Sequence, residues 1–134
     1  MLFRSNDTAT TEIYTIQHTL SLHDALPILI ALGNRWCDGV DAAIKEFKLP
    51  WHVNRLGARG EYLFQGDAPR TGGEAARAGD FALEQYIHLR LLNDGFLLTP
   101  FHNMALMSPV TTEADVDAHT HAFREMCKEI ASWN

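Results

Sequence analysis

One short stretch of the sequence combines side chains that could contact a reacting molecule. Phe101, His102 and Asn103 place an aromatic ring, an imidazole and an amide between two apolar segments, residues 96–99 and 104–107. Loops held by rigid elements often carry binding residues. We therefore predict that Phe101, His102 and Asn103 form a substrate-facing loop. The alternative is that Phe101 packs and that His102 and Asn103 satisfy the hydrogen bonds of a turn.

Lysine offers a second kind of chemistry, because a lysine amine in an apolar pocket can form a Schiff base. The chain has three lysines, Lys45, Lys48 and Lys128. The first two fall in the last turn of a predicted helix, where a cation suits the helix dipole and solvent. Lys128 lies off the apolar stripe of another helix. We expect all three to be solvated, so the sequence predicts no catalytic and no cofactor-binding residue.

The seven histidines do not show the spacing of a metal site. His119 and His121 are two residues apart on a predicted helix and should point to different faces, whereas zinc-binding helices use a spacing of four. The two cysteines, Cys37 and Cys127, form no Cys-x-x-Cys pair, and Cys127 falls on an apolar helix stripe. We predict no metal site and a buried Cys127.

Three arginines could bind a carboxylate or a phosphate, namely Arg55, Arg59 and Arg70. The alternative is that they are ordinary exposed residues of a strand and a loop. Glu61 follows Arg59 by two positions and is expected on the opposite face of the strand, so that the two need not pair.

The elements that would position these residues follow from apolar periodicity. Helical spacing begins at Leu29 and ends near Pro50, because proline disfavours helix in the residue before it. Alternating residues 53–64 predict a strand with Gly57 and Gly60 as a bulge or bend. A turn-rich loop follows.

A second helix is predicted over residues 74–93 and ends at Gly95, which can take a positive φ. The segments 96–99 and 104–107 are expected as a hairpin-like pair of short strands. Thr112 and Asp115 approximate a capping box at the start of the last helix. The sequence therefore predicts an α/β (α+β) fold, a small sandwich of a short, largely antiparallel sheet with helices on one face.

Composition limits the partners. The chain has 134 residues and a net charge of −6, which favours one globular domain and argues against nucleic acid or an anionic membrane surface. The longest apolar run, residues 25–32, is interrupted by Pro27 and is shorter than the ~20 residues of a membrane span. We expect a cytoplasmic protein.

The first 28 residues differ in character from the remainder. They are rich in Thr, Ser, Asn and Asp, and the string NDTATTEIYT…LSLHDALPI resembles translated sequencing-adaptor read-through. We therefore expect residues 1–28 to be a non-native or disordered leader and residues 29–134 to be the folded domain.

Three strings of the second segment together resemble a known family. RLGARGEYLF, LLNDGFLLTPFHNMALMSP and TTEADVDAHTHAF are similar to the C-terminal small domain of class III (fold type I) PLP-dependent aminotransferases, in particular glutamate-1-semialdehyde 2,1-aminomutase-like enzymes. The resemblance implies a homodimeric parent whose large domain, missing here, carries pyridoxal 5'-phosphate, the Schiff-base lysine and the pyridinium aspartate. It also implies that this fragment binds no cofactor itself.

The resemblance leaves the substrate open. Many class III transaminases have an arginine for the substrate carboxylate in the loop that reads PFHNMALMSP here, and this loop has none. The predicted function is an inactive fragment of a transaminase or aminomutase. The alternatives are a free-standing α/β ligand-binding or interaction module and a histidine-dependent metal hydrolase. A fragment should expose an apolar face to its missing domain, and a free-standing module should be polar there.

Overall fold

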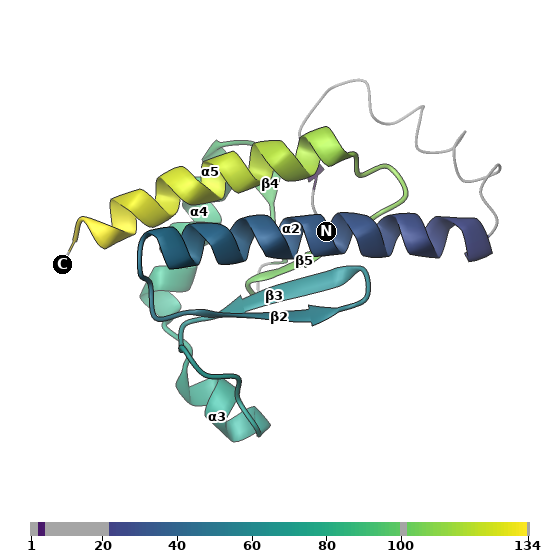
Figure 1. Ribbon diagram of the computed structural model, residues 1–134. Helices are drawn as coiled ribbons and strands as arrows, with labels where there is room; N and C mark the ends of the chain where they lie inside the picture. Colours follow the sequence, from purple (N-terminus) through teal and green to yellow (C-terminus); the bar gives the residue numbers. More distant parts are fainter. Residues whose placement is uncertain (1–2, 5–21, 100–101, 134) are drawn as a thin grey trace.

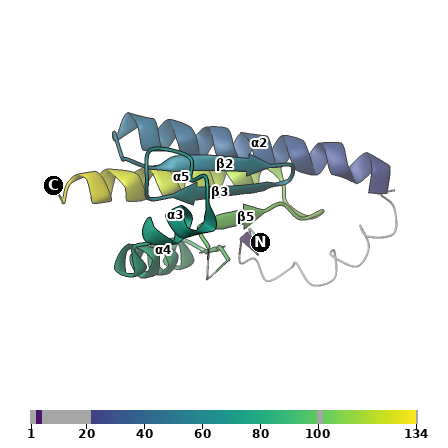
Figure 2. The same cartoon turned by 90° about the horizontal axis from the view of Figure 1, so that it is seen from below.

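The computed structural model describes residues 3–4, 22–99 and 102–133 (Figure 1). Its elements follow the order β1 (Phe3–Arg4), α2 (Leu22–Glu46), β2 (His52–Leu56), β3 (Arg59–Leu63), α3 (Gly72–Arg77), α4 (Phe81–Asn93), β4 (Phe96–Leu97), β5 (Met104–Leu106) and α5 (Glu113–Ala131). Helices α2 and α5 lie side by side over one face of the sheet, and α3 lies on the other side (Figures 1 and 2). None of the described helices is long and apolar enough to span a bilayer.

The main sheet has three antiparallel strands in the order β2-β3-β5. This arrangement confirms the predicted fold class of a short antiparallel sheet packed with helices. The expected pairing of residues 96–99 with 104–107 was wrong, because β4 pairs with β1 and β5 pairs with β3. Strand pairing depends on contacts between distant segments, which local apolar patterning does not specify.

The sheet has two unlike faces. On the inner face, which meets α2 and α5, Gly60, Tyr62 and Ala105 are completely or almost completely buried. On the outer face, cross-strand register aligns two rows of side chains. These rows are Leu56, Arg59 and Leu106, and Asn54, Glu61 and Met104.

A tight turn replaces the bend predicted within residues 53–64. Strands β2 and β3 form an antiparallel hairpin in which Leu56 pairs with Arg59. Gly57 has a φ of 59°, a conformation that glycine adopts without the steric cost of a Cβ atom. The second expected distortion is absent, since Gly60 pairs regularly with Arg55 in the hairpin and with Ala105 of β5.

The helix predicted over residues 74–93 is two helices. Thr71 caps α3, and its hydroxyl accepts a hydrogen bond from the Glu74 amide. Asp80 caps α4, and its carboxylate accepts a hydrogen bond from the Leu83 amide. A capping aspartate just after Gly79 begins a new helix, so the chain is divided into α3 and α4 at residues 78–80.

Capping signals in the sequence predicted the start of α5 and the end of α4, but not the start of α2. The capping box of Thr112 and Asp115 is confirmed, and so is the positive φ of Gly95 after α4. Helix α2, however, begins at Leu22 instead of Leu29 and contains Pro27. The division of the chain at residue 28 remains a prediction.

The core fills the space between the inner face, α2, α4 and α5. Its largest fully buried side chains include Trp36, Tyr62, Phe123, Ile87 and Leu91. Cys127 is buried as predicted, and burial raises the pKa of its thiol to about 12.

Candidate functional site

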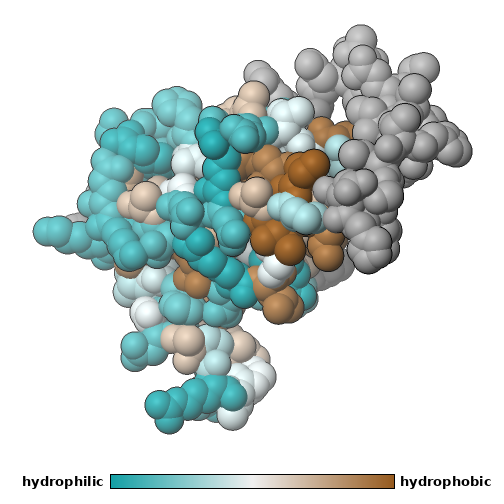
Figure 3. Space-filling model, turned by 45° about the vertical axis from the view of Figure 1, so that its right-hand side comes forward, coloured by the Kyte–Doolittle hydropathy of each residue, from teal (hydrophilic) through white to brown (hydrophobic). Residues whose placement is uncertain are grey.

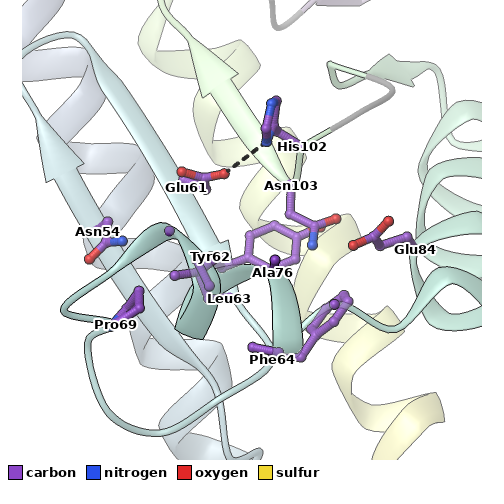
Figure 4. Close-up of a pocket in the computed structure, with 14 residues that line it drawn as sticks. Asn54, Glu61, Tyr62, Leu63, Phe64, Pro69, Ala76, Glu84, His102 and Asn103 are labelled. Atoms are coloured by element: carbon purple, nitrogen blue, oxygen red, sulfur yellow. Dashed lines mark ion pairs between the residues drawn. The ribbon is translucent and has the colours of Figure 1, made fainter.

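A cavity of about 470 Å³ opens beside the outer face of the sheet (Figure 4). Strand β3 forms one wall, residues 102–103 form a second, and α3 with the first turn of α4 forms a third. The polar residues of its lining are Asn54, Glu61, Tyr62, Glu84, His102 and Asn103. A volume of this size suits a small organic molecule.

Glu61 is a carboxylate that contacts the predicted loop. Its Oε1 lies 3.4 Å from Nδ1 of His102, and its Oε2 lies 3.9 Å from Nη2 of Arg59. The side chain of Glu61 is only 17% exposed. The expectation that Arg59 and Glu61 lie on opposite faces was wrong, because residues two apart in a strand share a face.

The predicted loop residues meet the cavity in part. His102 and Asn103 both line it, and Phe101 lies outside the described residues. The Asn103 carbonyl accepts a hydrogen bond from the Tyr62 amide at 3.0 Å, and the His102 amide donates to Thr99 at 3.3 Å. The first of these backbone bonds ties the loop to β3, and the second ties His102 to the residue that follows β4 by two positions.

Tyr62 lies where the cavity meets the core. Its side chain is fully buried, and its hydroxyl has no hydrogen-bond partner among the described residues. Burial raises the pKa of Tyr62 well above its ordinary value, and Cys127 and Glu84 add to the rise. The phenol therefore stays protonated, and its hydrogen-bonding capacity is unused by these residues.

The lysines of this chain do not fit a covalent cofactor site. Lys45 pairs with Asp41 across one turn of α2, and Lys128 pairs with Glu125 across one turn of α5. Lys48 is exposed beyond the end of α2. None of the three lines the cavity, so these residues provide no enclosed amine for a Schiff base with pyridoxal phosphate.

The described histidines and cysteines form no metal site. No group of three or more His, Cys, Asp or Glu side chains within residues 3–4, 22–99 and 102–133 could hold an ion. His119 is fully buried and His121 is exposed, as the two-residue spacing predicted. Burial lowers the pKa of His119 to about 3, so that its ring stays neutral.

The three candidate arginines lie outside the cavity lining. Arg55 pairs with Asp38 of α2 at 2.6 Å, and Arg59 faces Glu61. The backbone amide of Arg70 donates to Glu74 near the start of α3. The structure therefore favours the alternative that the three are ordinary exposed residues, of which Arg55 forms an ion pair.

Three cavity residues, Asn54, Tyr62 and Glu84, were not singled out from the sequence. Hairpin register places Asn54 opposite Glu61. Glu84 belongs to the first turn of α4, where a carboxylate also suits the helix dipole. Only the break between α3 and α4 turns Glu84 into a cavity residue, and residue spacing gives no signal for that geometry.

Comparison with known proteins gives a clear structural match. No family model and no curated protein matches the chain. Among solved structures, glutamate-1-semialdehyde aminomutase from Pseudomonas aeruginosa PAO1 in complex with PMP is 47% identical, with a TM-score of 0.79. That match covers 83% of this chain and 24% of the aminomutase. A second structure of a glutamate-1-semialdehyde aminomutase from this organism gives 46% identity and the same TM-score.

More distant structures share the fold. A β-phenylalanine aminotransferase from Variovorax paradoxus is 21% identical with a TM-score of 0.70, and the match covers 78% of this chain and 24% of that chain. The chain therefore spans about a quarter of the length of the structures that it matches.

These matches identify the class: the chain corresponds to a C-terminal part of the class III transaminases, as the sequence resemblance predicted. Within that class, the match at 47% identity is to the P. aeruginosa aminomutase.

Proposed function

We propose that this chain is the small domain of a PLP-dependent transaminase or aminomutase. The parent enzyme would transfer an amino group between an amino acid or amine and a keto or aldehyde compound. The observation that carries the proposal is the 47% identity, over 83% of this chain, to an aminomutase in complex with PMP. The large domain of the parent would hold pyridoxal 5'-phosphate, and the isolated chain would be inactive.

In this proposal the cavity side of the domain meets the substrate. Phe101, His102 and Asn103 would form the substrate-facing loop, since His102 and Asn103 line the cavity. Bound pyridoxal phosphate supplies the electron sink for amino transfer. This chain would bind and orient the substrate and exclude water from it.

Exposed apolar side chains support a missing partner domain. Leu56 is 70% exposed and Leu106 is 47% exposed, and both belong to the same outer row of the sheet. Leu26 and Ile28 at the beginning of α2 are also exposed. Figure 3 shows apolar surface gathered on one side of the molecule. Such a patch on a fragment is consistent with a surface that the large domain would cover.

The parent's assembly and location complete the proposal. By the family resemblance, the parent would be a homodimer. A cytoplasmic location is the expectation from the apolar runs of the sequence, which are too short for a membrane span. The net charge of −6 gives no support to a nucleic-acid partner.

Reductive trapping tests the predicted inactivity. The purified chain is mixed with pyridoxal phosphate and sodium borohydride, and peptide mass spectrometry locates the adducts. Because all three lysines are exposed on helices or at a helix end, we expect only low, scattered labelling. A stoichiometric adduct at a single lysine would contradict the proposal.

A graft tests the positive part of the proposal. Residues 29–134 replace the matching quarter of the P. aeruginosa aminomutase, and the product is assayed for bound cofactor and amino transfer. We expect a folded, cofactor-loaded and active hybrid. A hybrid that folds and binds cofactor but catalyses no amino transfer would count against a domain of this enzyme class.

A free-standing ligand-binding module is the second candidate. The observation in its favour is that residues of this chain alone enclose the 470 Å³ cavity. The exposed Leu56 and Leu106 argue against it, since a free-standing module should be polar on that row.

A further inference from the structure

We propose that Glu61 is a positioning residue for His102. Its carboxylate accepts the hydrogen bond of the Nδ1–H group, so that the neutral ring carries its proton on Nδ1 and offers Nε2 to the substrate. The contact between the two side chains carries the proposal, since Oε1 of Glu61 lies 3.4 Å from Nδ1 of His102 (Figure 4). The role towards substrate rests on the proposed function, whereas the position of the ring proton is a property of this chain alone.

The carboxylate of Glu61 is the more enclosed partner of this pair. The side chain of Glu61 is 17% exposed and that of His102 is 62% exposed. The carboxylate is therefore held against the sheet, while the imidazole beside it stays accessible. A carboxylate next to one ring nitrogen is a common means by which proteins fix the tautomer and the orientation of a histidine.

Backbone hydrogen bonds fix the main chain on both sides of the contact. Glu61 of β3 pairs with Met104 of β5, and the Tyr62 amide donates to the Asn103 carbonyl at 3.0 Å. The Met104 amide donates to the carbonyl of His102 at 2.7 Å and closes a three-residue turn. His102 therefore comes two positions before the residue that faces Glu61 across the sheet.

Arg59 approaches the other oxygen of the same carboxylate. Its Nη2 lies 3.9 Å from Oε2 of Glu61, whereas His102 lies next to Oε1. An ionised carboxylate has two acceptor oxygens, so Glu61 can face both groups at once. The contact with Arg59 therefore does not compete with the contact that holds the imidazole.

The geometry of imidazole determines what the second nitrogen can do. Nδ1 and Nε2 point away from each other, so Nε2 of His102 faces away from Glu61. In a neutral ring with its proton on Nδ1, Nε2 is a hydrogen-bond acceptor. Because His102 lines the cavity, the loop presents one fixed acceptor instead of a ring that can exchange its two tautomers.

Nitrogen-15 NMR of the purified, full-length chain tests the tautomer. Long-range proton–nitrogen correlation spectra are recorded at about pH 8.5, roughly two units above the ordinary pKa of histidine, and show which nitrogen of each neutral ring carries the proton. His102→Gln identifies the signals of His102 by their loss. Glu61→Leu removes the acceptor. The matched control is Glu84→Leu, which removes another carboxylate of the cavity lining, one that forms no ion pair with the described His102.

We expect the Nδ1–H tautomer to predominate at His102 in the unaltered chain and in Glu84→Leu. Glu61→Leu should lower the ratio of Nδ1–H to Nε2–H by roughly 3- to 10-fold, which corresponds to the loss of one hydrogen bond. The amide spectrum of each variant shows whether it is folded. A predominant Nε2–H tautomer in the unaltered chain would overturn the proposal without any variant. So would a ratio that falls no further in Glu61→Leu than in Glu84→Leu.

Kinetics of the grafted hybrid test the role towards substrate. His102→Ala and Glu61→Leu should each raise KM by roughly 3- to 10-fold with little change in kcat. The double variant should be no worse than His102→Ala alone, because Glu61 acts through His102. Glu113→Gln, at an exposed position of α5 outside the cavity, should leave both constants unchanged. Additive losses in the double variant would overturn the positioning role.

The two experiments separate this proposal from the proposed function. An active hybrid together with an Nε2–H tautomer at His102 would refute only the positioning role of Glu61. An inactive, cofactor-loaded hybrid together with an Nδ1–H tautomer that depends on Glu61 would count against the transaminase assignment and support the Glu61–His102 contact.

Discussion

The two faces of the three-stranded sheet differ in how completely their side chains are buried and in contact with other residues. On the inner face, Tyr62 stacks near Trp36 and Trp51 and contacts Phe123, with ring centroids 5.0–6.4 Å apart. On the outer face, Leu56 and Leu106 are exposed and Glu61 borders a cavity. The difference indicates that inner-face residues determine whether the domain folds, whereas outer-face residues are available for contacts outside the described chain.

The inner side of the molecule also contains a polar group that has no hydrogen-bond partner. His119 is fully buried, and both of its ring nitrogens lack a hydrogen-bond partner among the described residues. Its ring lies 5.6 Å from Trp36, 5.4 Å from Phe96 and 6.0 Å from Phe123. An uncharged, aromatic environment stabilises only the neutral imidazole.

The largest expected effect is a loss of stability at low pH, caused by the buried His119 on the inner side of the molecule. The pKa of His119 is lowered from 6.5 to about 3 in the folded chain, so between these values the unfolded chain binds more protons. The contribution of His119 to stability is therefore complete above pH 6.5 and is lost as the pH falls towards 3. We expect the free energy of unfolding to fall by up to about 1.4 kcal/mol per pH unit in this window, measured by urea unfolding.

A matched pair of variants isolates that effect. His119→Leu should remove the steep pH dependence, whereas His121→Leu, two residues away on the exposed side of α5, should keep it. Identical pH profiles for both variants would show that another group causes the acid sensitivity.

A methyl group added to the inner face is the second test. A Cβ atom at Gly60 would lie 2.5 Å from Sγ of Cys37 and 2.7 Å from the Trp36 ring. Both neighbours are buried in α2, so Gly60→Ala should lower the free energy of unfolding by about 1–3 kcal/mol. Gly66→Ala is the control because nothing lies within 4 Å of its added atom. Equal stability of the two variants would contradict the close packing of β3 on α2.

Substitutions on the outer face of the sheet should change the free energy of unfolding the least. Leu56→Ser and Leu106→Ser are expected to change the free energy of unfolding of the isolated chain by no more than about 0.5 kcal/mol. Leu91→Ser, at a fully buried leucine, should cost about 2–5 kcal/mol in the same urea titration. A large loss from either outer-face variant would mean that this row belongs to the core.

Much of the fold was predictable because its signals are local. Thr112 and Asp115 satisfy backbone groups within one turn, and Gly95 ends α4 through its own positive φ. The apolar spacing in α2 and α5 likewise predicted Cys127 as a core residue. The break between α3 and α4 was missed, because the capping roles of Thr71 and Asp80 were not separated from a continuous helical pattern.

The candidate site was predictable only in part. His102 and Asn103 stood out because a polar loop follows an apolar strand, and they do line the cavity. Asn54 and Glu84 come from β2 and α4, and no local spacing connects them to the loop. Their convergence depends on hairpin register and on the position of α4.

The sequence alone therefore determined most of the elements, the burial of Cys127 and the exposure of the lysines, since these follow from periodicity and from the chemistry of helix ends. The tertiary structure decided which strands pair, which face of the sheet is covered, and that Glu61 and Glu84 border one cavity. The physical reason is range: capping and amphipathicity act within one or two helical turns, whereas the cavity is built from segments that meet only when the chain packs.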